Sequence, residues 1–200
     1  MERSLEEIQE ELKKVLKKKR YSHTVGVRYT AQAMAMCFGE DIEKAGYAGM
    51  LHDCAKYLTD EEMLLECKKR RIVCSDTEKL RPSLLHAKLG ACYARDIYGI
   101  EDDKILSAIR WHTTGKPGMS NFEKIVFIAD YIEPGRKIIP GMEEIRRAAF
   151  CNLDEAMFLI LENTLSYLDD TSGSRRDTID AYTEDAYDFY KELRRRRKGA

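Results

Sequence analysis

Residues 50–56, with the sequence MLHDCAK, decide which fold the chain is expected to adopt. An apolar approach ends in His52 and Asp53, so two types of metal ligand stand at adjacent positions. Neighbours on a helix point about 100° apart, and both can touch metal only if the ions lie against that corner of the helix. With one carboxylate oxygen for each ion, Asp53 can bridge them. The stretch therefore predicts a helix that contributes to a two-metal centre.

The sequence on both sides of this stretch has helical periodicity. Apolar residues recur at spacings of three and four over almost the whole length, and no segment alternates with a strand period for long. We therefore expect an all-α helical bundle. The expected helices cover about residues 5–16, 22–38, 41–56, 59–71, 82–98, 102–113, 120–132, 142–168 (with a break near 152–154) and 178–197. Residues 72–81 lack periodicity and are expected to form a loop.

One domain is expected over residues 1–200, because no linker, repeat or low-complexity segment interrupts the chain. Residues 1–20 are expected to form an amphipathic cover helix. Its apolar stripe consists of Leu5, Ile8, Leu12, Val15 and Leu16. Residues 194–200 form a basic tail. This tail is typical of a solvated helix end whose cations suit the helix dipole, and a phosphate-binding tail is the less favoured alternative.

The composition argues against several classes of protein. A formal net charge of -1 is unusual for a general nucleic-acid binder. No stretch approaches the ~18 consecutive apolar residues of a membrane span, and the first residues do not resemble a signal peptide. We therefore expect a cytoplasmic protein without a nucleic-acid or membrane partner, and a homodimer is left open. The six cysteines form no C-x-x-C pair and are expected to stay reduced.

The chain has only four histidines, each on a different expected helix: His23, His52, His86 and His112. Any one of them alone would more often be a core or surface histidine than a metal ligand. His112 ends an apolar helical stripe just before a turn of small polar groups. There Thr113, Thr114 and backbone N–H groups can face an incoming anion while the imidazole faces a cleft.

Asp130 lies in the run KIVFIADYIEP, residues 124–134, whose apolar character predicts a buried helix. An ionised carboxylate in such a setting loses its hydration and is costly unless it is paired or bound to metal. A buried ion pair with lysine or arginine is the alternative. We favour a metal ligand.

These residues together resemble the HD superfamily of metal-dependent phosphohydrolases. The resemblance rests on a histidine, then the His-Asp doublet, then a distant aspartate, with two further histidines between the doublet and that aspartate. Four runs are similar to the YqeK family, bacterial HD proteins that hydrolyse diadenosine tetraphosphate symmetrically: HDCAK (52–56), LLHAKLGA (84–91), IRWHTTGKPGMS (109–120) and KIVFIADYIEPGR (124–136). The likeness extends from about Tyr21 to Tyr182.

The resemblance implies a fold and a ligand set. The fold would be a single HD-domain helical bundle with a dinuclear metal site. One iron would be held by His23, His52, Asp53 and Asp130. The second would be held by Asp53, His86 and His112. Imidazole and carboxylate ligands suit iron, manganese or zinc, and iron is the ion that the resemblance favours.

Further residues are expected to bind the phosphates of a nucleotide. Lys56 follows the doublet by one helical turn and would join Asp53 as a catalytic group, with surface solvation as its alternative. Arg136 can offer a bidentate fork to phosphate. The loop 171–178 contributes Gly173, Arg175 and Arg176 as a second anion site, or is simply a solvated loop between helices.

The expected activity is hydrolysis of a dinucleoside polyphosphate, diadenosine tetraphosphate by the resemblance, into two nucleoside diphosphates. Two alternatives stay open. One is an HD phosphohydrolase that acts on another nucleotide, such as a deoxynucleotide or a cyclic nucleotide. The other is a non-catalytic, metal-bound nucleotide sensor, which is disfavoured because no metal ligand is missing from the sequence.

Overall fold

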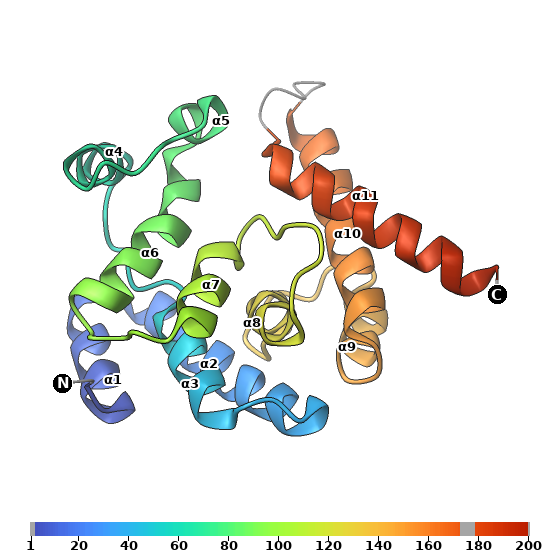
Figure 1. Ribbon diagram of the computed structural model, residues 1–200, viewed down its shortest axis with the longest axis horizontal. Coiled ribbons are helices and arrows are strands. Elements are labelled where there is room, and N and C mark those ends of the chain that lie inside the picture. The colour runs from blue at the N-terminus through green and yellow to red at the C-terminus, as the bar shows by residue number, and fades with distance from the viewer. Residues whose placement is uncertain (1–2, 173–178, 200) are drawn as a thin grey trace.

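In the computed structural model, which describes residues 3–172 and 179–199, the regular elements are all helical (Figure 1). The elements are α1 (Leu5–Val15), α2 (Lys18–Phe38), α3 (Ile42–Leu51), α4 (Asp60–Lys69), α5 (Asp76–Leu80), η1 (Pro82–Leu84), α6 (Leu85–Asp96), α7 (Asp103–Trp111), α8 (Asn121–Ile132), α9 (Met142–Ala149), α10 (Leu153–Ser172) and α11 (Ala181–Lys198). Those two ranges contain no strand, which confirms the expected all-α class. The expected break before residue 153 separates α9 from α10.

Local sequence signals explain where several helices begin and end. Thr59 caps α4 in a capping box with Glu62, as the sequence predicted, and Ser120 caps α8 in the same way with Glu123. Gly39 ends α2 at φ 69°, a left-handed conformation that glycine adopts without a steric penalty. These signals act over three or four residues, so the sequence alone locates them.

Three expected boundaries were wrong. Helix α2 begins at Lys18 and not near Ser22. The cover helix, expected over residues 1–20, is α1 and already ends at Val15. Helix α3 ends at Leu51 and not near Lys56, because the chain then turns through short backbone bonds such as Cys54 N to Leu51 O. The expected loop 72–81 contains the short helix α5, which a capping box at Ser75 starts.

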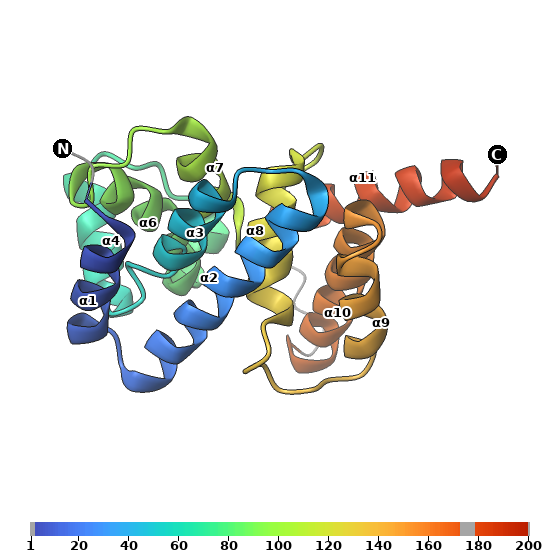
Figure 2. The ribbon, with the colours of Figure 1, turned by 90° about the horizontal axis from the view of Figure 1, so that it is seen from below.

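Helix α8 lies at the centre of the bundle (Figure 2). It packs against α2, α3 and α7 on one side and against α9 and α10 on the other. Residues 122–129 are all buried, which explains the apolar run that the sequence shows there. Helix α6 pairs with α7, and α11 pairs with α10. The elements that carry the four histidines and Asp130 therefore meet around one part of the core.

The two ends of the described chain pack on opposite sides of the bundle (Figure 1). Helix α1 buries Leu5, Ile8 and Leu12, as expected for a cover helix, but Val15 is 48% exposed. In α11, Arg194 and Arg197 pair with Glu155 and Asp154 of α10, at 2.8 Å and 2.7 Å. In the described chain, we find no helix long and apolar enough to cross a membrane.

Candidate metal centre

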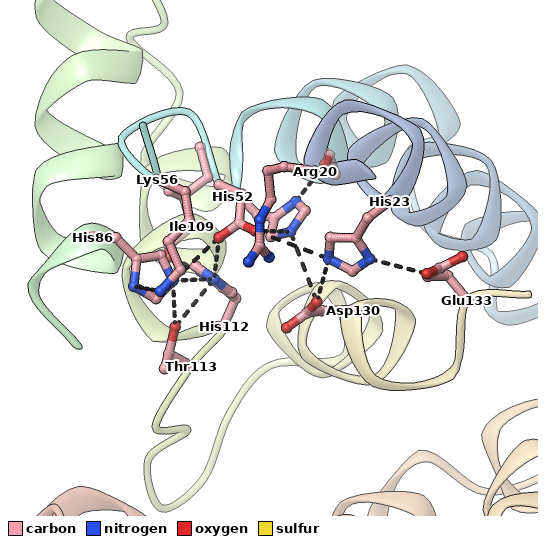
Figure 3. Close-up of polar contacts among 12 residues, drawn as sticks. Arg20, His23, His52, Lys56, His86, Ile109, His112, Thr113, Asp130 and Glu133 are labelled. Atoms are coloured by element: carbon pink, nitrogen blue, oxygen red, sulfur yellow. Dashed lines mark hydrogen bonds and ion pairs between the residues drawn. The ribbon is translucent and has the colours of Figure 1, made fainter. Parts of the chain in front are cut away.

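The four histidines and the two aspartates that the sequence singled out come together where helix ends converge. His52 lies at the C-terminal end of α3, and His112 lies at the C-terminal end of α7. His23 comes from α2, His86 from the first turn of α6, and Asp130 from the last turn of α8. Figure 3 shows His52 between His23 and Asp130 on one side and His86 and His112 on the other.

One half of this cluster consists of His23, His52 and Asp130, which form a group that could hold a metal ion. The Nε2 atom of His23 lies 2.9 Å from Asp130 Oδ1. The Nε2 atom of His52 lies 3.8 Å from the same oxygen. Asp53 reaches this half through Oδ2, which is 3.5 Å from His52 Nε2 and 3.9 Å from His23 Nε2.

The other half of the cluster gathers around the second carboxylate oxygen of Asp53. Its Oδ1 atom lies 3.3 Å from His86 Nε2 and 3.8 Å from His112 Nε2. The two Nε2 atoms are themselves 3.1 Å apart. The second group that could hold a metal ion consists of His52, Asp53 and His112, so His52 belongs to both groups. Asp53 thus presents one oxygen to each half, which is the arrangement of a bridging ligand.

Backbone carbonyl groups orient three of the four imidazole rings. In each case the acceptor is the carbonyl three residues earlier, at 2.5–2.7 Å from Nδ1. The pairs are His52 with Gly49, His86 with Ser83, and His112 with Ile109. A carbonyl oxygen only accepts, so we assign the proton of each neutral ring to Nδ1. The Nε2 lone pair then points into the cluster.

A carboxylate orients the fourth ring. His23 Nδ1 lies 3.0 Å from Oε1 of Glu133, which is buried. Glu133 only accepts, so Nδ1 of His23 is assigned a proton as well, and the Nε2 atoms of all four rings converge beside two carboxylates. The Nε2 atoms of His23 and His52 are buried without a hydrogen-bond partner among the described residues. Metal-ligating histidines typically donate their other ring N–H to a carbonyl or carboxylate in this way.

The donor set and its spacing fit transition-metal ions. Ligand atoms bound at about 2.1 Å to one tetrahedral or octahedral ion lie roughly 3.0–3.4 Å apart. The distances across both halves of the cluster, 2.9–3.9 Å, are close to that range. Three of the histidines and Asp53 are fully or almost fully buried, so water does not screen their facing lone pairs. These lone pairs repel one another unless a cation lies between them.

Burial and neighbouring groups shift the pKa of three residues of the cluster. Burial alone would raise the pKa of Asp53, but the surrounding imidazoles, His52 above all, hold it well below its ordinary value. The pKa of Asp130 is likewise lowered, because His23, His52 and Arg136 outweigh the effect of burial. Burial lowers the pKa of His86 to about 3. Both carboxylates are ionised and His86 is neutral at neutral pH.

Two residues of the cluster were missed at the level of sequence. Arg20 donates from Nη1 to Asp53 Oδ2 at 2.6 Å, and Glu133 holds His23. Arg20 precedes His23 by three residues on α2, a spacing that puts both on one helix face. Glu133 likewise follows Asp130 by three residues. In each case the spacing from a predicted ligand was the available signal.

The residues expected to bind phosphate lie in different places. Thr113 Oγ1 is 3.1 Å from both His86 Nε2 and His112 Nε2, inside the cluster. Lys56 is not one helical turn beyond the doublet, since α3 has ended, but its Nζ lies 2.9 Å from His86 Nδ1. Thr114 instead lines a small pocket with Glu78 and Asp180.

Arg136 lies directly beside the cluster. Its guanidinium donates to the backbone oxygen and to the carboxylate of Asp130, at 2.7 Å and 2.5 Å. The remaining expected phosphate ligands, Gly173, Arg175 and Arg176, lie outside the described residues.

A groove of about 830 Å³ opens from the His23 side of the cluster. Five cationic side chains line it: Lys17, Lys19, Arg20, Arg136 and Lys137. Tyr131, Ile139 and Met142 form an apolar wall of the groove. The acidic side chain in its lining is Glu133, which contacts His23. A volume of this size is typical of small-molecule sites, and the excess of cations favours an anionic ligand.

Comparisons with known proteins agree with this geometry. The HD domain family model matches residues 20–135. A symmetrical bis(5'-nucleosyl)-tetraphosphatase of Halalkalibacterium halodurans is 44% identical over 149 residues, which are 74% of this chain and 79% of that protein. The protein of the same name from Bacillus subtilis is 40% identical over 157 residues, 78% of this chain and 83% of the relative.

The fold has a close counterpart among solved structures. A crystal structure from Clostridium acetobutylicum, described as a predicted HD superfamily hydrolase involved in NAD metabolism, aligns with a TM-score of 0.90 at 37% identity. The alignment covers 96% of this chain and 100% of that one. The chain therefore belongs to the HD-domain family and, within it, to the YqeK family of symmetrical bis(5'-nucleosyl)-tetraphosphatases.

Proposed function

We propose that this protein is a metal-dependent hydrolase that cleaves diadenosine tetraphosphate symmetrically into two molecules of ADP. The observation that carries the proposal is the convergence of four imidazole Nε2 atoms and two carboxylates at the end of a cation-lined groove. Two relatives that match 74% and 78% of the chain bear the name of this activity.

We further propose how the side chains divide the metal ions. His23, His52, Asp53 and Asp130 would hold one ion, and Asp53, His86 and His112 would hold the other. The proposed ion is iron, with manganese or zinc as alternatives of similar ligand preference. When bound, such a pair supplies an activated water and neutralises charge on the phosphoryl group under attack. Asp53 has the central role, because its two oxygens face the two halves of the cluster.

The polyphosphate chain would leave the cluster through the groove. Arg20 and Arg136 lie at its inner end, where they contact Asp53 and Asp130. Lys17, Lys19 and Lys137 follow along the walls and would pair with phosphates farther from the bond that breaks. The apolar wall around Tyr131 is suited to a nucleoside. The groove thus matches one half of the substrate, with phosphates next to the cluster and a nucleoside beyond them.

Other residues would act at the reacting phosphate. Lys56 Nζ lies beside His86 and keeps a cation close to the cluster, where it would offset negative charge as the phosphoanhydride breaks. Burial lowers the pKa of this lysine. Thr113 offers a hydroxyl between His86 and His112, and Thr114, Gly173, Arg175 and Arg176 remain expected phosphate ligands. The two threonines belong to the turn after α7.

Hydrolysis in oxygen-18 water tests the proposed bond. Attack on the second phosphate from one end breaks the central P–O–P bridge and releases two molecules of ADP. One oxygen-18 atom should appear in half of the ADP, on the terminal phosphate. Release of AMP and ATP instead would overturn the symmetrical reaction and leave a two-metal phosphohydrolase of different regiochemistry.

A substrate panel separates the alternatives. A phosphohydrolase for a deoxynucleotide or cyclic nucleotide would turn that compound over faster than diadenosine tetraphosphate. A sensor would bind nucleotide without turnover, but no expected metal ligand is missing from the cluster.

We also propose that residues 1–200 act as one HD domain. The cytoplasmic location and the open question of a homodimer rest on the sequence alone.

A further inference from the structure

The His23 ring is held between two carboxylates that come from the same helix end. Asp130 Oδ1 lies 2.9 Å from Nε2, and Glu133 Oε1 lies 3.0 Å from Nδ1 on the opposite edge of the ring. Figure 3 shows the line Glu133, His23, Asp130 leading into the cluster. Asp130 thus contacts the Nε2 side of the ring, which faces the cluster, and Glu133, three residues later, contacts the Nδ1 side.

Two glycines make room for the Glu133 side chain. A Cβ atom at Gly26 would lie 2.5 Å from Glu133 Oε2, and one at Gly135 would lie 2.9 Å from the same oxygen. Gly135 also donates its backbone N–H to Oε2 at 2.5 Å. Arg146 donates to the carbonyl of Glu133 and fixes the backbone there. The chain thus provides space and a donor for a carboxylate that is 3% exposed.

Glu133 differs from the partners of the other three rings. His52, His86 and His112 each face a neutral carbonyl oxygen. A carboxylate carries a full negative charge, so it polarises Nδ1–H more strongly and makes Nε2 a stronger electron donor. His23 is therefore the one ring of the four whose Nδ1–H faces an anionic acceptor.

We infer that Glu133 is a positioning residue that makes the His23, His52 and Asp130 half the tighter of the two metal positions. The inference rests on the metal ligands proposed above. Glu133 keeps Nδ1 of His23 protonated and increases the donor strength of its Nε2. His86 and His112 have only neutral carbonyl acceptors, and at His86 the cation Lys56 Nζ also lies 2.9 Å from Nδ1. The two positions should consequently fill in sequence, the His23 side first.

Titration of the metal-free protein with Zn²⁺ against a chelating indicator tests the order of filling. The wild type should bind two ions in two resolved steps. Glu133→Gln keeps an oxygen acceptor for His23 but removes the charge, and it should weaken the tighter step by roughly 10–100-fold while the weaker step stays unchanged. Two unchanged steps in Glu133→Gln would overturn the inference, as would weakening of both steps to the same degree.

Nitrogen-15 NMR of the histidine rings gives a second measurement that needs no metal. In the metal-free wild type, Nδ1 of His23 should be protonated because Glu133 only accepts, whether or not Nε2 also carries a proton towards Asp130. Glu133→Ala, and Gly26→Ala, which forces the carboxylate aside, should shift His23 towards a mixture of tautomers and leave His52 unchanged. A His23 ring that stays on Nδ1–H in both variants contradicts the role of Glu133. These spectra also report whether each variant is folded.

Glu123→Gln is the matched control. Glu123 and Glu133 are both buried carboxylates, but Glu133 caps the C-terminal end of α8, whereas Glu123 lies in its first turn and contacts Ser107 and Lys116. Its loss should leave both Zn²⁺ steps unchanged, and a weakened tighter step in this variant would show that the effect of Glu133→Gln is not specific. A protein that binds two ions as described but does not hydrolyse diadenosine tetraphosphate would refute the proposed function alone.

Discussion

The Nε2 atoms of His86 and His112 face one another at 3.1 Å, and both rings direct Nδ1 at a backbone carbonyl. Two lone pairs in contact inside a buried site destabilise the metal-free protein unless a proton or a cation separates them. The native cluster is thus arranged for metal and not for the empty state.

Metal should therefore stabilise the fold. At a free concentration about 100 times the Kd, one ion that binds only the folded state adds about 2.7 kcal/mol. For a domain of this size the expected rise in Tm is roughly 5–10 °C over the chelated protein. Thermal unfolding with and without a chelator measures it. Equal Tm values would contradict the metal centre, and His112→Ala should reduce the shift.

Asp53→Ala should abolish hydrolysis and reduce metal content, because its two oxygens face both halves of the cluster. Lys56→Ala should keep the metal and lose roughly 10–100-fold in kcat, since that residue contributes charge and no ligand atom. Metal analysis beside steady-state kinetics distinguishes the two. Near-normal turnover by Asp53→Ala with metal bound would refute the bridging role.

The groove should bind the polyphosphate through charge. Combined replacement of Lys17, Lys19 and Lys137 by alanine should raise KM roughly tenfold with kcat little changed, because these residues line the groove and not the cluster. The difference should shrink at high ionic strength. Lys13→Ala on α1 serves as the control. A loss in kcat with KM unchanged would argue against the groove.

Cys54 should prove structural although it follows the doublet directly. Its thiol is fully buried and donates to the carbonyl of Gly90 at 3.5 Å, and burial raises its pKa. A thiol that stays protonated is a poor metal ligand. Cys54→Ser should retain both metal ions, since a hydroxyl can donate to the same carbonyl. Loss of metal in this variant would show that the sulfur is a ligand.

Glu123 should make stability depend on pH. Burial alone would raise its pKa, but hydrogen bonds from Ser107, Lys116 and the Ser120 backbone hold it below the usual value. A lowered pKa in the folded state stabilises the protein above pH ~4.5, and this contribution disappears as pH falls through the folded pKa. Glu123→Gln should cost about 1.5–3 kcal/mol at pH 7 and progressively less near pH 3 in denaturant unfolding.

Much of the site followed from the sequence because its signals are local. The doublet after an apolar run, and Asp130 in a buried helix, mark polar groups where burial is costly, and the structure does bring them together. The all-α class followed from periodicity. Capping residues such as Thr59 set helix starts within a few residues.

The parts that the sequence did not reveal depend on contacts between distant segments. Glu133 meets His23 across 110 positions, and Arg20 meets Asp53 across 33. Before the fold is known, each reads as an ordinary charged residue near a helix end. The early end of α3 was missed for a related reason, because apolar periodicity continues through Ala55 although the backbone has changed to tighter turns.

The carbonyl partners of three histidines have a consequence for protein design. The acceptor residue is glycine at 49, serine at 83 and isoleucine at 109. The backbone carbonyl, and not the side chain of that residue, orients each ring. A designer who transplants these ligands onto another scaffold would copy a helix terminus and a three-residue offset, not a partner side chain. His23 alone would have to be moved together with an acidic companion and the two glycines that leave space for it.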